Sequence, residues 1–331
     1  MLKIKKIQFI FISFSLLLLM SGTLFAANPN YLDHLLGPLV LAKSSVLQSR
    51  MREDSAHDRF ESLAEIKNLM IYSHRQLELI VTKDSRFDDK NMDQIILWNQ
   101  SIARLLSGLR LAFEDSNDEI RLEALNNFEE LNTPFKNLLS FYAKRYKKAG
   151  KNEQYQISEC VQKMSPVFTN LISSISSNFY HPNKKIVKKS RESMLILNEY
   201  LQMTHSILKD SVRFKDQKIQ QETLETLDSM APGILASMPL LKRAVKSDDV
   251  NVKRDAILAL KQITLMTGEM VDALNQISKR IQNQSPLRST LFFNQQAFDQ
   301  ALYTLRLVSQ DSDPAIRKIA ADTLKEINVA L

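Results

Sequence analysis

The chain has 331 residues and a net charge of +7, with only 6 glycines, 9 prolines and one cysteine. So few turn-forming residues argue against an all-β or α/β fold, which needs a turn about every 8–12 residues. One cysteine excludes an internal disulfide, so the fold has to be held by side-chain packing. Apolar residues recur at i, i+3 or i+4, and i+7, which predicts helix through almost all of the chain after Ala26.

The N-terminal segment 1–26 has the pattern of a secretory signal peptide. Lys3, Lys5 and Lys6 precede an apolar run at 9–20, and small residues surround Ala26. The run is shorter than the roughly 18–20 residues of a membrane-spanning helix, which favours cleavage over an uncleaved anchor. Cleavage removes three lysines and no acidic residue, so the net charge falls from +7 to +4. We therefore expect an exported protein, periplasmic or secreted, with no membrane span after signal cleavage.

The region 27–114 is predicted to contain long amphipathic helices, at about 60–81 and 92–113. It does not show the repeat described below. Two interpretations stay open, namely degenerate repeats or an N-terminal helical cap.

From 115 to 331 the sequence repeats. Five segments align on one apolar anchor, and three positions earlier each has an Asn or Asp suited to cap the start of a helix. Small residues follow four and seven positions after the anchor, and apolar ones eight and eleven positions after it, all on one helix face. The anchors are Ile120, Ile186, Ile219, Val252 and Ile316, and the caps are Asn117, Asn183, Asp216, Asp249 and Asp313.

The spacing of the anchors is regular, because the anchor numbers differ by 66, 33, 33 and 64 in turn. These differences fit one period near 33 with two copies passed over. Pro134, Pro166 and Pro232 are interpreted as the first turn of a second helix in each unit. The predicted unit is therefore helix, short turn, helix, repeated in roughly eight to nine pairs over the mature chain.

Two segments, 248–263 and 311–327, resemble bacterial HEAT-like (armadillo-type) repeats, whose first helix opens with Asp-Pro-x-x-Val/Ile-Arg. Arg121, Lys253 and Arg317 match the basic position after the anchor, whereas Val187 and Gln220 depart from it. The resemblance implies an all-α fold, an α-solenoid of antiparallel helix pairs with a period of roughly 33 residues and a degenerate N-terminal part. It implies no functional residues, because these repeats share a structure and not a site.

No pattern for catalysis, a cofactor or a metal is present. There is no glycine-rich phosphate loop, no H-E-x-x-H and no G-x-S-x-G, and the five histidines are scattered. Cys160 lies within a helical pattern without a flanking glycine and is interpreted as a packing residue. We predict no catalytic, cofactor-binding or metal-binding residues, and hence a protein that is not an enzyme.

Two basic clusters are the candidate binding residues for an acidic protein partner. The first, in 144–151, contains Lys144, Arg145, Lys147 and Lys148, with Lys151 at its end; the second, in 183–192, contains Lys184, Lys188 and Arg191. The alternatives are that the first cluster complements a helix C-terminus and that the second is a solvated helix face. Aromatic residues are not interleaved with these charges, which disfavours nucleic acid as a partner.

The function that follows is a non-catalytic scaffold or adaptor for protein–protein interaction, in the cell envelope or outside the cell. One alternative is a secreted effector that binds a host protein. The other is a lyase-type or hydrolase-type activity not visible in the sequence, since some HEAT-like proteins are chromophore lyases. The oligomeric state stays open.

Overall fold

The computed structural model describes residues 29–83, 89–278 and 285–331, and the predicted signal peptide at 1–26 lies outside them. Within these ranges all regular structure is helical, which confirms the predicted all-α class. The helices are α2 (Pro29–Arg50), α3 (Ala56–Lys83), α4 (Asp89–Phe113), α5 (Asp118–Glu130), α6 (Asn132–Tyr146), α7 (Lys151–Ser177), η1 (Asn178–Tyr180), α8 (Lys184–Val212), α9 (Gln217–Ala244), α10 (Val250–Ser278), α11 (Ser285–Val308) and α12 (Pro314–Ala330).

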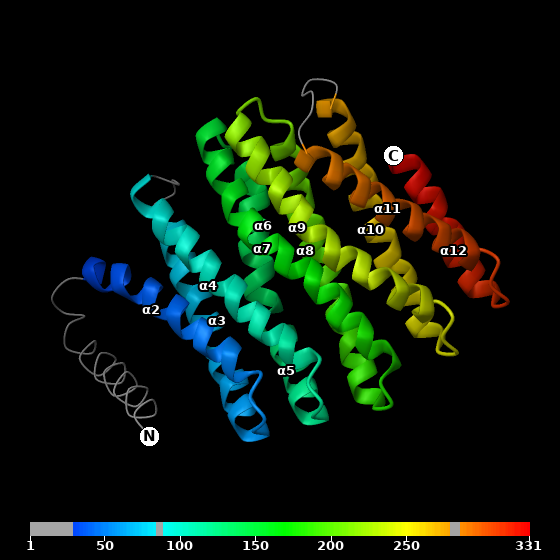
Figure 1. Ribbon diagram of the computed structural model, residues 1–331, viewed down its shortest axis with the longest axis horizontal. Coiled ribbons are helices and arrows are strands. Elements are labelled where there is room, and N and C mark those ends of the chain that lie inside the picture. The colour runs from blue at the N-terminus through cyan, green and yellow to red at the C-terminus, as the bar shows by residue number, and fades with distance from the viewer. Residues whose placement is uncertain (1–28, 84–88, 279–284) are drawn as a thin grey trace.

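The helices stack side by side in two layers, which makes the molecule an α-solenoid (Figure 1). Helices α2, α4, α7, α9 and α11 pack in order in the first layer. The second layer contains α3, the consecutive pair α5 and α6, then α8, α10 and α12. Short turns join the layers wherever the connection lies in the described ranges; successive long helices run antiparallel, and neighbours within a layer run parallel (Figure 1). The predicted solenoid of antiparallel helix pairs is confirmed.

The predicted caps begin the helices as the sequence indicates. Asn117, Asn183, Asp216, Asp249 and Asp313 each accept a hydrogen bond at 2.8–3.0 Å from a backbone N–H of the first helical turn. Pro314 occupies the start of α12, where its missing N–H costs no hydrogen bond.

The repeat register describes the packing. All five small residues four positions after the anchors are fully buried: Ala124, Ser190, Thr223, Ala256 and Ala320. Four anchors are buried too, but Ile219 on α9 is only half-buried and the adjacent Gln220 takes the inner position. The reason is that α9 belongs to the first layer, whereas the other four segments all begin helices of the second layer.

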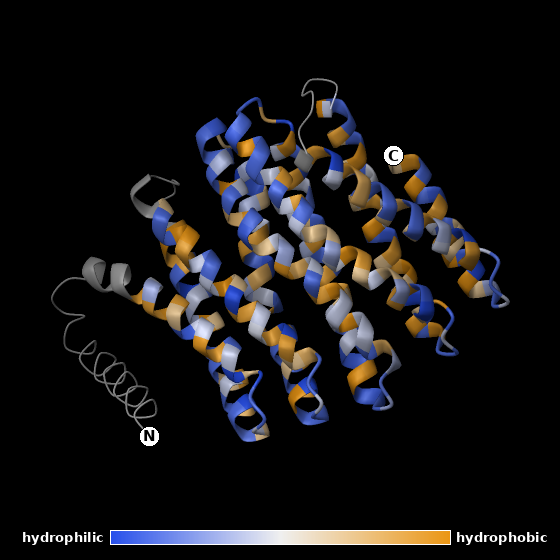
Figure 2. Ribbon diagram, viewed as in Figure 1, coloured by the Kyte–Doolittle hydropathy of each residue, from blue (hydrophilic) through white to orange (hydrophobic). Residues whose placement is uncertain are grey.

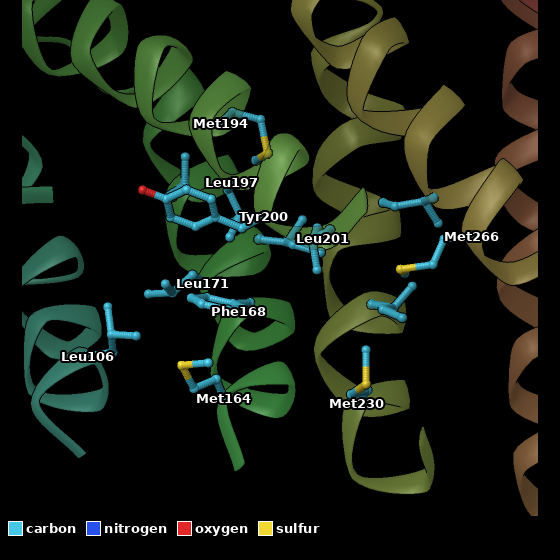
Figure 3. Close-up of a cluster of buried hydrophobic side chains, with 14 of the residues drawn as sticks. Leu106, Met164, Phe168, Leu171, Met194, Leu197, Tyr200, Leu201, Met230 and Met266 are labelled. Carbon is cyan, nitrogen blue, oxygen red and sulfur yellow. The ribbon is translucent and has the colours of Figure 1, made fainter. Parts of the chain in front are cut away.

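The core runs through the array without a break. In the part shown in Figure 3, Phe168 of α7 lies next to Tyr200 of α8, with Leu106 of α4 on one side and Met230 of α9 and Met266 of α10 on the other. Figure 2 shows apolar residues along every helix and mainly hydrophilic residues in the turns at the lower edge. Each helix pair therefore buries its apolar stripe against its neighbours.

The predicted length of the helix-turn-helix unit and the predicted start of its second helix are wrong. The period near 33 separates one helix start from the next, so a pair spans about two periods, and the described chain forms five pairs instead of eight to nine. Pro166 lies inside α7 and Pro232 inside α9, so neither begins a helix. Only Pro134 lies near a helix start, that of α6.

Helices α5 and α6 together take the place that one long helix fills in each other pair. Leu131 ends α5 and directly precedes α6, and no side chain caps this second start. Within 27–114, α2 and α3 form the first pair, and α4 continues through the turn at 114–117 into α5.

Candidate functional site

Several cations are used inside the fold, where they tie successive helices of the second layer together. Arg59 of α3 donates to Asp115, before α5, with Nε–Oδ2 2.7 Å and Nη2–Oδ1 3.1 Å. Lys253 of α10 makes the corresponding contact to Asp311, before α12, at 2.9 Å. Because Asp115 and Asp311 also accept the backbone N–H of the cap two residues later, each pair fixes the start of the next helix.

The basic position of the resemblance is therefore structural. Arg121 donates to Asn178 Oδ1 at 2.7 Å, and Arg317 donates to the carbonyl of Asp311 at 2.7 Å. Val187 departs from this pattern, and Arg191 one turn later on α8 pairs instead with Asp255 of α10, at 2.6 Å between Nε and Oδ2. Arg121 and Arg191 therefore join neighbouring helices, whereas Arg317 fixes the turn before its own helix.

The structure separates the two predicted basic clusters. Asn183 and the start of α8 lie beside Asp118 and the start of α5, at the lower edge in Figure 1. The ring of Tyr146 at the end of α6 lies 6.5 Å from that of Phe214, after the end of α8, at the upper edge. Since α8 is 29 residues long, about 43 Å of helix separates the clusters, and they cannot form one site.

In the lower cluster, Lys184 and Lys188 are exposed, and Lys188 only approaches Glu192 at 3.9 Å. Arg191 is not available to a partner because Asp255, its counter-ion, is 1% exposed. This cluster matches the solvated helix face that the sequence left open.

The residues of the upper cluster lie in different environments. Arg145 forms an ion pair with Glu153 of α7, and Lys144 lines a cavity between α3 and α6. Lys147 and Lys148 are exposed in the turn that leads to α7. Lys151, the last residue of this cluster, lines the cavity described next.

A cavity of about 790 Å³ opens where α7 begins, α8 ends and α9 begins; we call it the basic cavity. It contains four cations, one carboxylate and two aromatic rings. Its lining is Lys151, Asn152, Tyr155, Arg213, Phe214, Lys215, Asp216, Lys218 and Ile219.

The charge of the basic cavity is only slightly neutralised by the protein. Within the described ranges, Lys151, Arg213 and Lys215 form no ion pair with a carboxylate, and all three are exposed. Lys218 has a distant partner in Glu222 at 3.8 Å, and Asp216 is engaged as the cap of α9. The cavity is therefore positively charged and attracts anions.

The start of α7 adds to this field. Its N-cap is Gly150, which offers no side-chain acceptor to the backbone N–H groups of the first turn. Such groups carry the positive end of the helix dipole. Beside them, the Tyr155 ring lies 6.0 Å from Lys218 Nζ and gives the cavity an aromatic wall.

Sequence reasoning missed Arg213, Lys215 and Lys218 as a site. The segment 213–218 contains three cations, which is the local signal. However, their meeting with Lys151 depends on the antiparallel packing of α7 and α8, and no local pattern shows that.

The predicted packing role of Cys160 agrees with its environment. The side chain is fully buried on α7, and burial raises the pKa of its thiol, which disfavours the nucleophilic thiolate. Among the described residues, no three His, Cys, Asp or Glu side chains are grouped to hold a metal ion. Nor does any helix in those ranges combine the length and apolarity needed to cross a bilayer.

No protein-family model matches the chain, and no curated protein sequence matches it. Among solved structures, a designed armadillo repeat protein in complex with the peptide (KR)4 is 14% identical, covering 85% of this chain and 98% of that chain, with a TM-score of 0.23. A circular tandem repeat protein is 10% identical over 90% of this chain and 71% of that chain, with a TM-score of 0.41. Human deoxyhypusine hydroxylase is 10% identical over 88% and 98%, with a TM-score of 0.17.

Proposed function

We propose that the protein is an exported, non-catalytic scaffold that binds an acidic segment of a partner protein in the basic cavity. The single observation behind this is the set of exposed cations, Lys151, Arg213 and Lys215, that have no acidic partner in the described ranges and lie around one cavity. The cations that tie successive helices together, Arg59, Arg191 and Lys253, are each paired with a carboxylate, whereas the three around the cavity are not.

The shape and chemistry of the cavity favour a peptide over a free ion. Its volume of about 790 Å³ is far larger than a small anion needs. The rings of Tyr155 and Phe214 offer an apolar surface to the hydrophobic part of a peptide side chain, and the cations form ion pairs with the carboxylates of the peptide. Lys147 and Lys148 in the preceding turn extend the positive surface along the same edge.

The proposal includes export of the protein from the cytoplasm and its membership of the HEAT-like repeat proteins. The pattern at 1–26 supports secretion, to the periplasm or the medium, and the cap, anchor and basic register supports a divergent HEAT-like repeat. Fractionation of the producing cells tests export: the mature protein is expected outside the cytoplasm, shortened by about 26 residues. Full-length protein in the cytoplasm would contradict it.

A charge-reversal experiment tests the binding site. A fluorescein-labelled peptide of alternating Glu and Phe is titrated with the protein, and anisotropy is measured at low and physiological salt. The double variant Arg213→Glu/Lys215→Glu is expected to weaken binding by about tenfold or more, with the wild-type affinity falling as salt increases.

The control makes the same change of charge at the opposite edge, Lys184→Glu/Lys188→Glu. It is expected to bind like the wild type, because those residues lie a helix length from the cavity. Equal losses in the two double variants would show a general charge effect and contradict the site. Tighter binding of a single-stranded oligonucleotide than of the peptide would contradict a protein partner.

A further inference from the structure

A second cavity, of about 590 Å³, lies between α3 and α6, and we call it the His74 cavity. Its lining comes from α3 and α6, with Glu130 from the end of α5. Its volume is in the range of about 300–1,000 Å³ that is usual for small-molecule sites. It is distinct from the basic cavity and does not depend on the function proposed above.

Part of the His74 cavity is apolar. Ile71 and Val81 line it from α3, and Leu138 and Phe141 line it from α6. Val81 and Leu138 are more than nine-tenths buried, whereas Ile71 and Phe141 are only partly covered. These side chains form a surface on which a flat or branched apolar group is removed from water.

The buried histidine of this cavity has unused hydrogen-bonding capacity. His74 is 5% exposed, and its Nε2 is shielded from solvent without a hydrogen-bond partner among the described residues. Its ring packs edge-on against Phe135 at 4.2 Å between centroids. Burial lowers the pKa of His74 to about 3, so the ring is neutral at physiological pH and offers one donor or one acceptor at Nε2. A buried polar atom without a partner is unfavourable, and a ligand can relieve this.

The charges at the cavity balance. The lining contains two cations, Arg75 and Lys144, and two carboxylates, Glu78 and Glu130. In contrast to the basic cavity, there is no excess of one sign to select an ion. The ligand that fits this lining is uncharged overall.

We propose that the His74 cavity binds a small neutral amphiphile, whose apolar body lies on Ile71, Leu138 and Phe141 and whose one polar group hydrogen-bonds to His74 Nε2. Because Nε2 is shielded from solvent, a lining side chain has to turn aside in the complex, a common change on binding. The polar group thereby gains a partner in a water-free environment, where a hydrogen bond discriminates strongly between ligands.

The first test uses N-phenyl-1-naphthylamine, a neutral probe whose fluorescence increases in apolar surroundings. Wild-type protein is expected to bind it saturably at one site. Asn137 is exposed at the cavity, so Asn137→Trp fills the mouth and is expected to weaken binding by about tenfold or more.

The control is Asn328→Trp, the same substitution at an exposed position of α12. It is expected to bind the probe like the wild type, as is Arg213→Glu/Lys215→Glu in the basic cavity. Fluorescence that does not saturate, or equal binding by the two tryptophan variants, would overturn the proposal.

The second test addresses His74 itself, by displacement of the probe with 1-naphthol or 1-methylnaphthalene. These have similar shapes, but only the first has a hydroxyl group. Wild-type protein is expected to prefer 1-naphthol by about tenfold, and His74→Phe is expected to abolish this preference while still binding 1-methylnaphthalene. No preference in the wild type would overturn the role of His74, and if His74→Phe does not fold, this wild-type comparison decides.

Discussion

Two cations of one helix stripe illustrate how far burial changes the role of a residue. Lys188 and Arg191 have the same sign and lie three positions apart on α8. Lys188 has a side-chain exposure of 72%, whereas Arg191 is directed to the carboxylate of Asp255, which is 1% exposed. A buried carboxylate needs its counter-ion, because the cost of its desolvation remains when the partner is removed.

Arg191→Ala is therefore expected to lower the free energy of unfolding by about 3 kcal/mol, the lower end of the range for breaking a buried ion pair. The lower end applies because Arg254 Nε remains 3.4 Å from Asp255. Lys188→Ala is the control and should change stability by less than about 0.5 kcal/mol. Urea unfolding measures both, and similar values for the two variants would refute the assignment.

The buried small residues four positions after the anchors give a second prediction at the residue scale. Ala256 of α10 is fully buried, so a larger side chain there forces the neighbouring helices apart. Ala256→Leu is expected to destabilise by about 1–3 kcal/mol. Ala321→Leu, at an exposed position of α12, should leave the urea midpoint almost unchanged. A wild-type midpoint for Ala256→Leu would show that the register is misassigned.

At the scale of helices, the sequence pattern predicts the capped helix starts correctly but also predicts starts at positions that lie inside helices. The five caps and the buried column follow from local chemistry, because a cap and its anchor lie on the same turn. The pattern predicts helix starts at Pro166 and Pro232, yet α7 and α9 continue through them, since tertiary packing offsets the lost hydrogen bond. The basic cavity could not be predicted, because it forms where α7, α8 and α9 meet.

The crossing of α7 and α9 depends on Gly233. A Cβ atom there would lie 2.7 Å from the carbonyl carbon of Thr169 and 2.8 Å from the backbone N of Asn170. Backbone cannot turn aside as a side chain can, so Gly233→Ala is expected to destabilise by about 1–3 kcal/mol. Gly150→Ala is the matched control, because its Cβ would meet nothing within 4 Å. Thermal unfolding compares them, and equal melting temperatures would contradict the close approach.

The contact between α8 and α10 includes a charge cluster that makes stability depend on pH. Oε2 of Glu269 on α10 lies 3.1 Å from His205 Nε2 and 2.7 Å from Lys209 Nζ, and both of these residues are on α8. The hydrogen bond from His205, followed by that from Lys209, lowers the pKa of Glu269 from 4.5 to about 2. Burial lowers the pKa of the His205 ring.

The lowered pKa of Glu269 determines how stability changes with pH. A carboxyl group with a lowered pKa stabilises the fold above pH 4.5 and loses this contribution as the pH falls from 4.5 to 2. The melting temperature of wild type is therefore expected to exceed that of Glu269→Gln at pH 7, and the difference should shrink below pH 4.5. Glu326→Gln, at a surface ion pair with Lys261, is the control. A difference that grows on acidification would contradict the interpretation.

At the scale of the whole molecule, each pair of helices contacts its neighbours and few others, so stability is close to a sum over adjacent pairs. The C-terminal helix α12 packs mainly on α10 and α11. Thr323 and Ile327 are buried there, and the Leu331 side chain lies against the backbone at Gly268 of α10. In contrast, Val329 is 82% exposed, so only part of the apolar end at 328–331 is used for packing.

Truncation after Ala321 removes the buried side chains of Thr323 and Ile327 and the contact of Leu331 at Gly268, and it exposes the apolar face of α10 and α11. The truncated protein is therefore expected to melt at a markedly lower temperature and to aggregate more readily. Because the basic cavity lies on α7, α8 and α9, the remaining folded protein should still bind the Glu-Phe peptide with wild-type affinity at a temperature below its transition. Circular dichroism and peptide anisotropy on the same sample test both parts. A truncated protein that melts like the wild type but no longer binds the peptide would instead place the binding surface on α12.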